Sequence, residues 1–299
     1  MHDQAHKLRQ RMQLLVNSSL PLPAVKPSNK AHTIAVTSGK GGVGKTNFTI
    51  NFAIQLAKSG YCVVLFDADL GLANIDVMLG ISPRYTLFDL LRPDVTIYDV
   101  MERGPHDVRV IPGSSGLQEL FTLTSAQGEQ IIEQLRELQH FADFIIVDTG
   151  AGLSEQVLPL ILSADDVVLV TTPEPTAITD GYAVMKYLFK RRSDLSLWVL
   201  VNRTVSSKEA NQTGNKMKSV AREFLRQEIQ LLGSLPENPD VVRSVKRQQP
   251  FTECYPHSPV SRSLRQVMRH YLNVREQTPM QAEGGGFMRF LQHIIRRKT

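Results

Sequence analysis

Residues 37–46 have the sequence Thr37-Ser38-Gly39-Lys40-Gly41-Gly42-Val43-Gly44-Lys45-Thr46. It follows a β-branched run and opens an amphipathic stretch, which is the strand–loop–helix context of a phosphate-binding P-loop. Glycines let the backbone bend so that successive amide groups point at phosphate oxygens, and the new helix adds its positive N-terminal end. We expect Lys45 to reach the outer phosphates and the Thr46 hydroxyl to bind Mg²⁺. The predicted nucleotide-binding residues of the loop are Gly39, Lys40, Gly41, Gly42, Val43, Gly44, Lys45, Thr46 and Asn47.

Outward from this loop, short apolar runs alternate with longer amphipathic stretches. This alternation predicts parallel strands joined by crossover helices, in a doubly wound, mostly parallel α/β sheet. The predicted strands are Thr33–Thr37, Cys62–Phe66, Val108–Ile111, Phe144–Val147, Val167–Thr171, Leu197–Val201 and Ile229–Gly233. The predicted helices are Lys45–Lys58, Ser125–Phe141, Ser154–Leu162, Ala177–Lys190, Glu209–Gln227, Asp240–Gln248 and Pro259–Glu276. They form one domain, residues 32–276, with a helical segment outside it at each end.

Polar side chains follow several of the predicted strands. Asp67 and Asp69 follow the second strand, Asp148 ends the strand at residues 144–147, and Asn202 with Arg203 ends the strand at residues 197–201. The carboxyl ends of parallel strands meet at one edge of a sheet, where phosphate also binds. One such residue alone is often only a strand-end cap, but the set predicts a single site. Asn202 has an amide suited to a purine edge.

The charge of the chain is concentrated at its ends. Of 299 residues, 34 are Lys or Arg and 29 are Asp or Glu, a formal net charge of +5. Residues 1–30 and residues 287–299 each contribute +4, which leaves −3 for residues 31–286. The predicted body is mildly acidic, and the basic residues belong to the two appendages.

The composition excludes several classes of protein. With 42% hydrophobic and 21% charged residues the chain is in the globular range. It has neither an apolar stretch long enough for a spanning helix nor the apolar core of a signal peptide. Its two cysteines, Cys62 and Cys254, fit no disulfide framework or metal knuckle. We therefore expect a cytoplasmic protein with reduced thiols.

The second lysine of the loop, Lys40, gives residues 37–46 a resemblance to the deviant Walker-A ATPases of the MinD/ParA family. The resemblance covers nearly the whole chain and implies ATP, ADP and Mg²⁺ as ligands. It also implies a homodimer with two ATP molecules at its interface, in which Lys40 reaches the phosphates of the opposing subunit. Lys40, Lys45 and Asp69 would then be catalytic, with Asp69 orienting the attacking water. Hydrolysis would be slow and would depend on dimerisation.

By the same resemblance, Thr46, Asp67 and Asp148 belong to the Mg²⁺ site, with Asp67 near the first switch and Asp148 acting through water. Asn202 would hydrogen-bond the adenine base, and Arg203 and Pro236 would also contact the nucleotide. The tract 67–76 and the motif at residues 236–239 favour the MinD branch over the DNA-segregating ParA branch. Asn47 departs from the pattern, since many relatives have a second Thr or Ser there. We expect nucleotide binding to survive, because the magnesium ligand is the preceding residue.

The N-terminal segment, residues 1–20, begins Met1-His2-Asp3-Gln4-Ala5-His6-Lys7-Leu8-Arg9 and places apolar residues at helical spacing. It resembles the activator motif of the FlhG group, MinD-like regulators of flagellar number and placement. The resemblance implies that Asp3, Gln4, Leu8 and Arg9 bind FlhF, a GTPase of the signal-recognition-particle class, and stimulate its hydrolysis. A basic amphipathic arm that only packs on the body is the alternative. Residues 21–31, rich in proline, are the expected linker.

At the other end, a linker at residues 277–286 closes with Gly284, Gly285 and Gly286 and leads to a basic amphipathic segment, residues 287–299. Its apolar face consists of Phe287, Met288, Phe290, Leu291, Ile294 and Ile295. It resembles the membrane-targeting helix of the family and would bind anionic lipid at the inner face of the cell membrane. A packed terminal helix and a nucleic-acid arm are the alternatives. The triple glycine, read as a flexible joint, favours the membrane helix.

Three other functions remain open from the sequence. The first is a division-site MinD. Loss of the protein would then misplace septa, whereas loss of a flagellar regulator would misplace flagella. A ParA-like DNA partitioner needs a basic body, which the charge of −3 disfavours, so nucleic acid is not an expected partner. A cluster-scaffold relative needs paired cysteines. For the FlhG reading, the expected partners are a second copy of the chain, FlhF, components of the flagellar C-ring or basal body, and anionic lipid.

Overall fold

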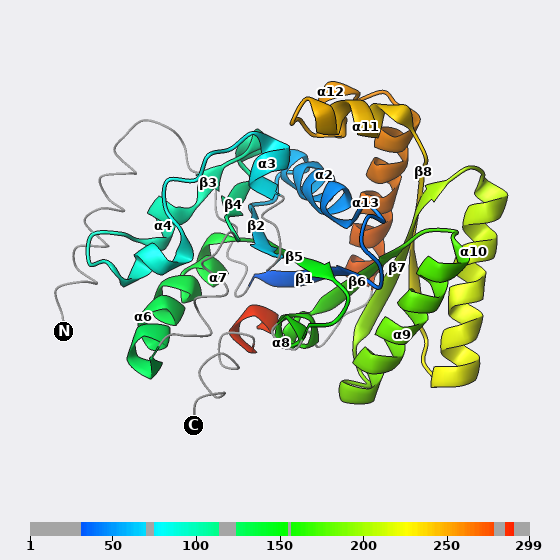
Figure 1. Ribbon diagram of the computed structural model, residues 1–299, viewed down its shortest axis with the longest axis horizontal. Coiled ribbons are helices and arrows are strands. Elements are labelled where there is room, and N and C mark those ends of the chain that lie inside the picture. Colours follow the sequence, from blue (N-terminus) through cyan, green and yellow to red (C-terminus); the bar gives the residue numbers. More distant parts are fainter. Residues whose placement is uncertain (1–30, 70–74, 114–123, 155–156, 278–284, 290–299) are drawn as a thin grey trace.

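The computed structural model describes residues 31–69, 75–113, 124–154, 157–277 and 285–289 (Figure 1). Within them lies an eight-stranded sheet of order β3-β4-β2-β5-β1-β6-β7-β8. The strands are β1 (His32–Ser38), β2 (Val63–Ala68), β3 (Glu102–Arg103), β4 (Arg109–Ile111), β5 (Phe144–Ala151), β6 (Asp166–Thr171), β7 (Ser196–Thr204) and β8 (Gln230–Pro236). The seven predicted strands are all present and parallel, which confirms the doubly wound α/β class. The antiparallel edge strand β3 was not predicted, because two residues carry no periodic pattern.

Strand β1 lies in the middle of the sheet, between β5 and β6. All seven of its residues are buried. Its three central residues, Ile34, Ala35 and Val36, are apolar, and such a run is typical of a strand covered on both faces, so the sequence predicted it. Its carboxyl end therefore delivers the glycine loop to the centre of one sheet edge.

The helices connect the strands as crossovers. The longer ones are α2 (Lys45–Lys58), α6 (Ser125–Arg136), α9 (Pro175–Arg191), α10 (Ser207–Val220), α11 (Pro239–Lys246) and α13 (Pro259–Gln277). The shorter ones are α3 (Ile75–Leu79), α4 (Ile97–Val100), α7 (Leu138–Phe141), α8 (Leu158–Ser163) and α12 (Phe251–Cys254). Short 3-10 turns lie at Leu87–Leu91 and Pro105–Asp107, and a π turn at Ala221–Leu225.

Two predicted helices are interrupted. The stretch predicted as Glu209–Gln227 is α10 followed by the π turn, and Arg226 then ends it in the left-handed region with φ 54°. The stretch predicted as Ser125–Phe141 is α6 and α7, separated at Glu137. Apolar periodicity continues across both breaks, so the sequence pattern did not reveal them.

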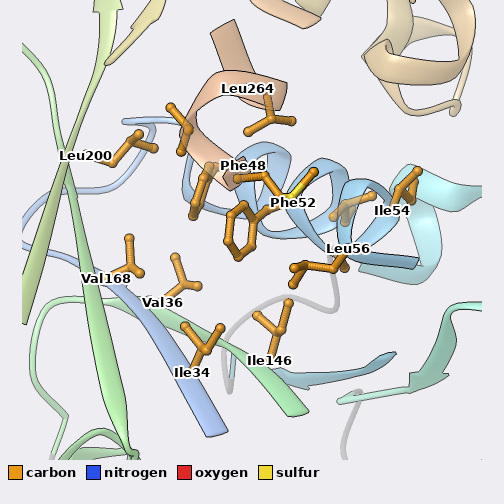
Figure 2. Close-up of a cluster of buried hydrophobic side chains, with 14 of the residues drawn as sticks. Ile34, Val36, Phe48, Phe52, Ile54, Leu56, Ile146, Val168, Leu200 and Leu264 are labelled. Atoms are coloured by element: carbon orange, nitrogen blue, oxygen red, sulfur yellow. The ribbon is translucent and has the colours of Figure 1, made fainter. Parts of the chain in front are cut away.

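One face of the sheet is covered by α2 and α13. Figure 2 shows Phe48, Phe52 and Leu56 of α2 against Val36 and Ile146 of the central strands. Phe48 and Phe52 stack with their ring centroids 5.1 Å apart. Helix α2, which carries the loop lysine at its first residue, is therefore fixed rigidly over the sheet.

The opposite face is covered by several helices. Helices α6 and α7 lie over β2 and β5, α8 lies over the centre, and α9 with α10 lies over β6 and β7 (Figure 1). None of the described helices is long and apolar enough to cross a membrane.

A buried polar network joins the amino ends of the central strands, at the edge opposite the glycine loop. Asp166 accepts hydrogen bonds from the Tyr271 hydroxyl at 2.7 Å, from Trp198 Nε1 at 3.1 Å and from Ser196, and its Oδ2 lies 2.7 Å from His32 Nε2. Burial raises the pKa of Asp166, but the contacts with His32, Ser196 and Tyr271 outweigh it and hold the pKa at about 2. The network therefore fastens β1, β6, β7 and α13 together.

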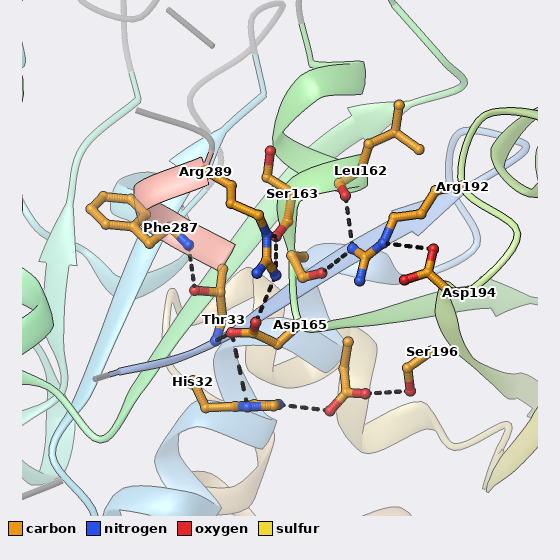
Figure 3. Close-up of polar contacts among 12 residues, drawn as sticks. His32, Thr33, Leu162, Ser163, Asp165, Arg192, Asp194, Ser196, Phe287 and Arg289 are labelled. Carbon is orange, nitrogen blue, oxygen red and sulfur yellow. Dashed lines mark hydrogen bonds and ion pairs between the residues drawn. The ribbon is translucent and has the colours of Figure 1, made fainter. Parts of the chain in front are cut away.

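The start of the C-terminal segment docks on this same edge (Figure 3). Phe287 is fully buried in the core cluster over β2 and β5, and its amide donates to Thr33 Oγ1 at 3.1 Å. Arg289 Nη2 donates to Asp165 Oδ1 at 2.9 Å and to the Ser163 carbonyl at 3.1 Å.

This docking corrects the expectation of a free glycine joint. Gly286 is buried, and a Cβ there would lie 2.6 Å from the Ser163 carbonyl oxygen. In this conformation Phe287 and Met288 pack on the body, Met288 only partly buried, and their predicted contact with lipid stays a prediction. Gly286 is needed for this close approach of backbone to backbone, and the sequence alone did not distinguish that from flexibility. Phe290, Leu291, Ile294 and Ile295 lie outside the described residues.

Candidate nucleotide-binding site

The glycine loop connects Ser38 at the end of β1 to Lys45 at the start of α2. Gly42 has φ 78° and Gly44 has φ 93°, both in the region that side-chain-bearing residues rarely adopt. Gly39 lies so close to the backbone of Asp180 on α9 that a Cβ would collide with it. These three glycines are therefore required by the path of the loop, which is the P-loop conformation that the sequence predicts.

Lys45 is paired with Asp148 across the site. Its Nζ donates to Asp148 Oδ1 at 3.1 Å, and both side chains are buried. Thr49, one turn further along α2, has its hydroxyl 3.0 Å from the same carboxylate oxygen. The predicted phosphate-binding lysine and the predicted Mg²⁺ residue are thus adjacent.

The second carboxylate oxygen of Asp148 supplies a test of whether a cation fits. Oδ2 is buried and has no hydrogen-bond partner among the described residues, although a buried anionic oxygen is costly to leave unpaired. Thr46, whose hydroxyl is the other predicted ligand, is half-buried on the first turn of α2. Carboxylate, hydroxyl and water oxygens suit Mg²⁺, so these residues fit a Mg²⁺–nucleotide complex.

Asp67 and Asp69 lie at the end of the neighbouring strand. Asp67 is directly opposite Asp148 in the β2–β5 register and is 1% exposed. Its two oxygens accept the backbone amides of Asp69 at 3.0 Å and Ile75 at 3.3 Å. In this conformation Asp67 holds both ends of the segment between β2 and α3. Gly150 of β5 lies close to the Asp69 carboxylate, because a Cβ on Gly150 would be 3.1 Å from Asp69 Oδ1.

Lys40 lies at the mouth of the site. Its side chain is 44% exposed, and its Nζ donates to Glu174 Oε2 at 3.0 Å and to Thr176 Oγ1 at 3.1 Å. Glu174 and Thr176 are at the start of α9. Lys40 is therefore turned toward α9 of its own chain.

The ends of β7 and β8 form the other wall. Asn202 Nδ2 donates to the Val43 carbonyl at 2.7 Å, so the residue predicted to read adenine contacts the loop directly. Arg203 is exposed and in the left-handed region with φ 58°. Pro236 ends β8 and pairs with Thr204 of β7. These residues flank the loop on the side away from Asp67.

The structure brings together the loop, Asp67, Asp69, Asp148 and Asn202 at one sheet edge. Sequence reasoning missed three residues that contact them, namely Thr49, Glu174 and Thr176. Thr49 had a signal, because it lies one helical turn after Lys45 and so faces the same way. Glu174 and Thr176 gave none, since only the fold places them beside the loop. Asp3, Gln4, Leu8 and Arg9 lie outside the described residues.

The chain is similar to known proteins over most of its length. A ParA family model, described as NUBPL iron-transfer P-loop NTPase, matches residues 29–272. The chain is 37% identical over 257 residues to the antiactivator FleN of Pseudomonas aeruginosa, covering 86% of this chain and 90% of FleN. It is 32% identical over 272 residues to the flagellum site-determining protein YlxH of Helicobacter pylori, covering 90% of this chain and 92% of YlxH.

Among solved structures, the septum site-determining protein MinD of Pyrococcus horikoshii, complexed with Mg-ADP, superimposes with a TM-score of 0.66. The identity is 25%, covering 84% of this chain and all of that chain. The sequence and structural matches, together with the glycine loop and its second lysine, lead to one conclusion. The chain belongs to the ParA/MinD family of P-loop NTPases, whose members are ATPases.

Proposed function

We propose that this chain is an ATP-dependent switch that regulates the number and placement of flagella. It dimerises around ATP, attaches reversibly to the inner face of the cell membrane and stimulates the GTPase FlhF. The similarity over most of the chain to a flagellum site-determining protein, YlxH, and to the antiactivator FleN supports the biological role. The observation that carries the switch is Lys40, a second lysine at the exposed mouth of the site.

The site residues suit phosphoryl transfer to water. With ATP bound, Lys45 would exchange Asp148 for the outer phosphates, and Thr46 and Asp148 would hold Mg²⁺, Asp148 through water. Bound Mg²⁺ neutralises charge on the phosphates. Asp69, at the end of β2 beside Gly150, orients the attacking water. Asn202, Arg203 and Pro236 bind the base. Such catalysis depends mainly on positioning and on charge neutralisation.

Dimerisation requires Lys40 to change partners. In the single chain its ammonium group is held by Glu174 and Thr176, an exposed ion pair worth at most about 1 kcal/mol. The phosphates of an opposing subunit carry more charge than one carboxylate, so Lys40 transfers to them when two ATP-bound copies meet. Hydrolysis is then slow and dependent on the dimer.

Membrane attachment through residues 287–299 requires the docked start of this segment to leave the body, because Phe287 is buried there. A single short amphipathic helix is a marginal anchor, whereas two helices on one dimer gain avidity. Nucleotide state would in this way set membrane attachment.

The FlhF role is tested by purified components. Replacing Gln4 with Ala is expected to abolish stimulation of GTP hydrolysis by FlhF, while Gln10→Ala in the same segment leaves it intact. Stimulation that is unchanged by Gln4→Ala would remove this role from Gln4.

The cellular role is tested by deletion. Loss of the protein is expected to change the number or position of flagella, with components of the C-ring or basal body as the partners at the flagellar site. Misplaced septa with normal flagella would instead identify a division-site MinD.

A further inference from the structure

We infer that Thr49 is a positioning residue for Asp148, and that its hydroxyl fixes the carboxylate so that Oδ2 faces the Mg²⁺ position when Lys45 has moved to the phosphates. The inference rests on the proposed Mg²⁺–nucleotide function of the site. It assigns a role to a residue outside the glycine loop.

The Thr49 hydroxyl lies within hydrogen-bond distance of two acceptors. Thr49 is fully buried on α2, and its Oγ1 lies 3.0 Å from both the Lys45 carbonyl oxygen and Asp148 Oδ1. A hydroxyl has one proton to donate. A carboxylate is the stronger acceptor, because hydrogen bonds to a charged group are shorter and about twice as strong. The Thr49 hydroxyl therefore donates to Asp148.

The two oxygens of the Asp148 carboxylate differ in their contacts. Lys45 and Thr49 both donate to Oδ1 of Asp148, at 3.1 and 3.0 Å. Oδ2 is buried, and none of the residues that the structure describes donates a hydrogen bond to it. Two donors on one oxygen define the rotation of the carboxylate group, and they leave the other oxygen for a bound ligand.

The contact from Thr49 remains when Lys45 leaves Asp148. Phosphate oxygens attract the ammonium group away from Asp148, and this removes one of the two contacts on Oδ1. Thr49 cannot follow, because its side chain is enclosed between α2 and the sheet. The hydrogen bond from Thr49 then holds the Asp148 carboxylate in its orientation. Residues that hydrogen-bond to metal ligands commonly have this role.

The test uses the full-length chain with Thr49→Val, which keeps the shape of the side chain and removes the hydroxyl. Thr49→Ser restores the hydroxyl. Thr213→Val is the control, because Thr213 is also buried on a helix but lies on α10, over β7. Circular dichroism first establishes that each variant is folded. Binding of a fluorescent ATP analogue is then measured in EDTA and over a series of Mg²⁺ concentrations.

For Thr49→Val, the Mg²⁺ concentration that gives half of the Mg²⁺-dependent gain in binding of the ATP analogue is expected to rise about tenfold or more. This is the range typical of losing a hydrogen bond that orients a metal ligand. Affinity in EDTA should not change, and Thr49→Ser and Thr213→Val should match the wild type. An unchanged Mg²⁺ dependence in Thr49→Val overturns the inference. Equal loss of binding in EDTA and in Mg²⁺, or a Thr49→Val chain that does not fold while Thr49→Ser does, assigns Thr49 a structural role and also overturns it. A wild-type chain that binds no nucleotide would refute the proposed function instead.

Discussion

A single methyl group at Gly286 is expected to release the C-terminal segment from the body. In Gly286→Ala the new Cβ would lie 2.6 Å from the Ser163 carbonyl oxygen and 2.9 Å from the Asp165 amide nitrogen. Both are backbone atoms at the end of α8 and the start of β6, so they cannot move aside as a flexible side chain would. Residues 286–289 must then leave their present position.

The free energy lost on undocking can be judged from the side chains that the docked segment buries. Phe287 is fully buried, which is worth about 2 kcal/mol for an aromatic side chain. The Arg289–Asp165 ion pair adds less, because the Arg289 side chain is 47% exposed. A loss of about 2 kcal/mol lowers the docking equilibrium about thirtyfold.

Two assays read this out in the absence of nucleotide. Hydrogen exchange should show faster exchange of the Phe287 amide, which donates to Thr33 in the docked state. Flotation with anionic vesicles should show more bound protein. Gly128→Ala on α6 is the control, because a Cβ there meets no atom of the described residues within 4 Å. If Gly286→Ala matched Gly128→Ala in both assays, the reasoning from backbone contact would be refuted.

Three further predictions concern stability, binding and reactivity. Asp166 has its pKa held at about 2, below the ordinary 3.8, so its ionised form stabilises the fold above pH 4 and this contribution, about 2 kcal/mol, is lost between about pH 4 and pH 2. Urea unfolding of Asp166→Asn should show lower stability at pH 7 and a smaller decrease over that acid range; an equal decrease in both proteins would contradict this. Asn202→Ala should weaken ATP binding measured by calorimetry, since it removes the hydrogen bond to the Val43 carbonyl, and an unchanged affinity would exclude Asn202 from the site. Partial burial raises the pKa of Cys62 to about 11, so iodoacetamide at pH 8 should modify it roughly a hundredfold more slowly than an ordinary thiol, and labelling at the ordinary rate would contradict the raised pKa.

The sequence predicted most of the elements that form the site because local physics fixes them. A buried parallel strand must be apolar on both faces, as β1 is, and a loop with left-handed residues needs glycine, as at Gly42 and Gly44. Strand-end carboxylates such as Asp148 must meet at one edge once the strands are parallel. These rules need no knowledge of distant contacts.

The remaining features depend on contacts between distant residues, which no local pattern contains. The sequence pattern indicated an exposed helix at Phe287 and a flexible joint at Gly286. In the fold, Phe287 bonds to Thr33 and Gly286 packs on Ser163, and both partners are far away in sequence. Asp67 was predicted as a residue of the Mg²⁺ site, which stays a prediction; the sequence did not indicate that its oxygens also accept the backbone amides of Asp69 and Ile75. In each case the partner was supplied by the fold.

If ATP joins two copies of this chain through Lys40, light scattering will detect a change in mass. Asp69→Ala should bind ATP without hydrolysing it, and its mass should then be twice the 33.5 kDa of the chain, but 33.5 kDa with ADP. Adding Lys40→Ala to this variant should return the mass to that of the single chain with ATP present. An Asp69→Ala protein that binds ATP yet stays at 33.5 kDa, or one that doubles its mass without Lys40, would contradict the account.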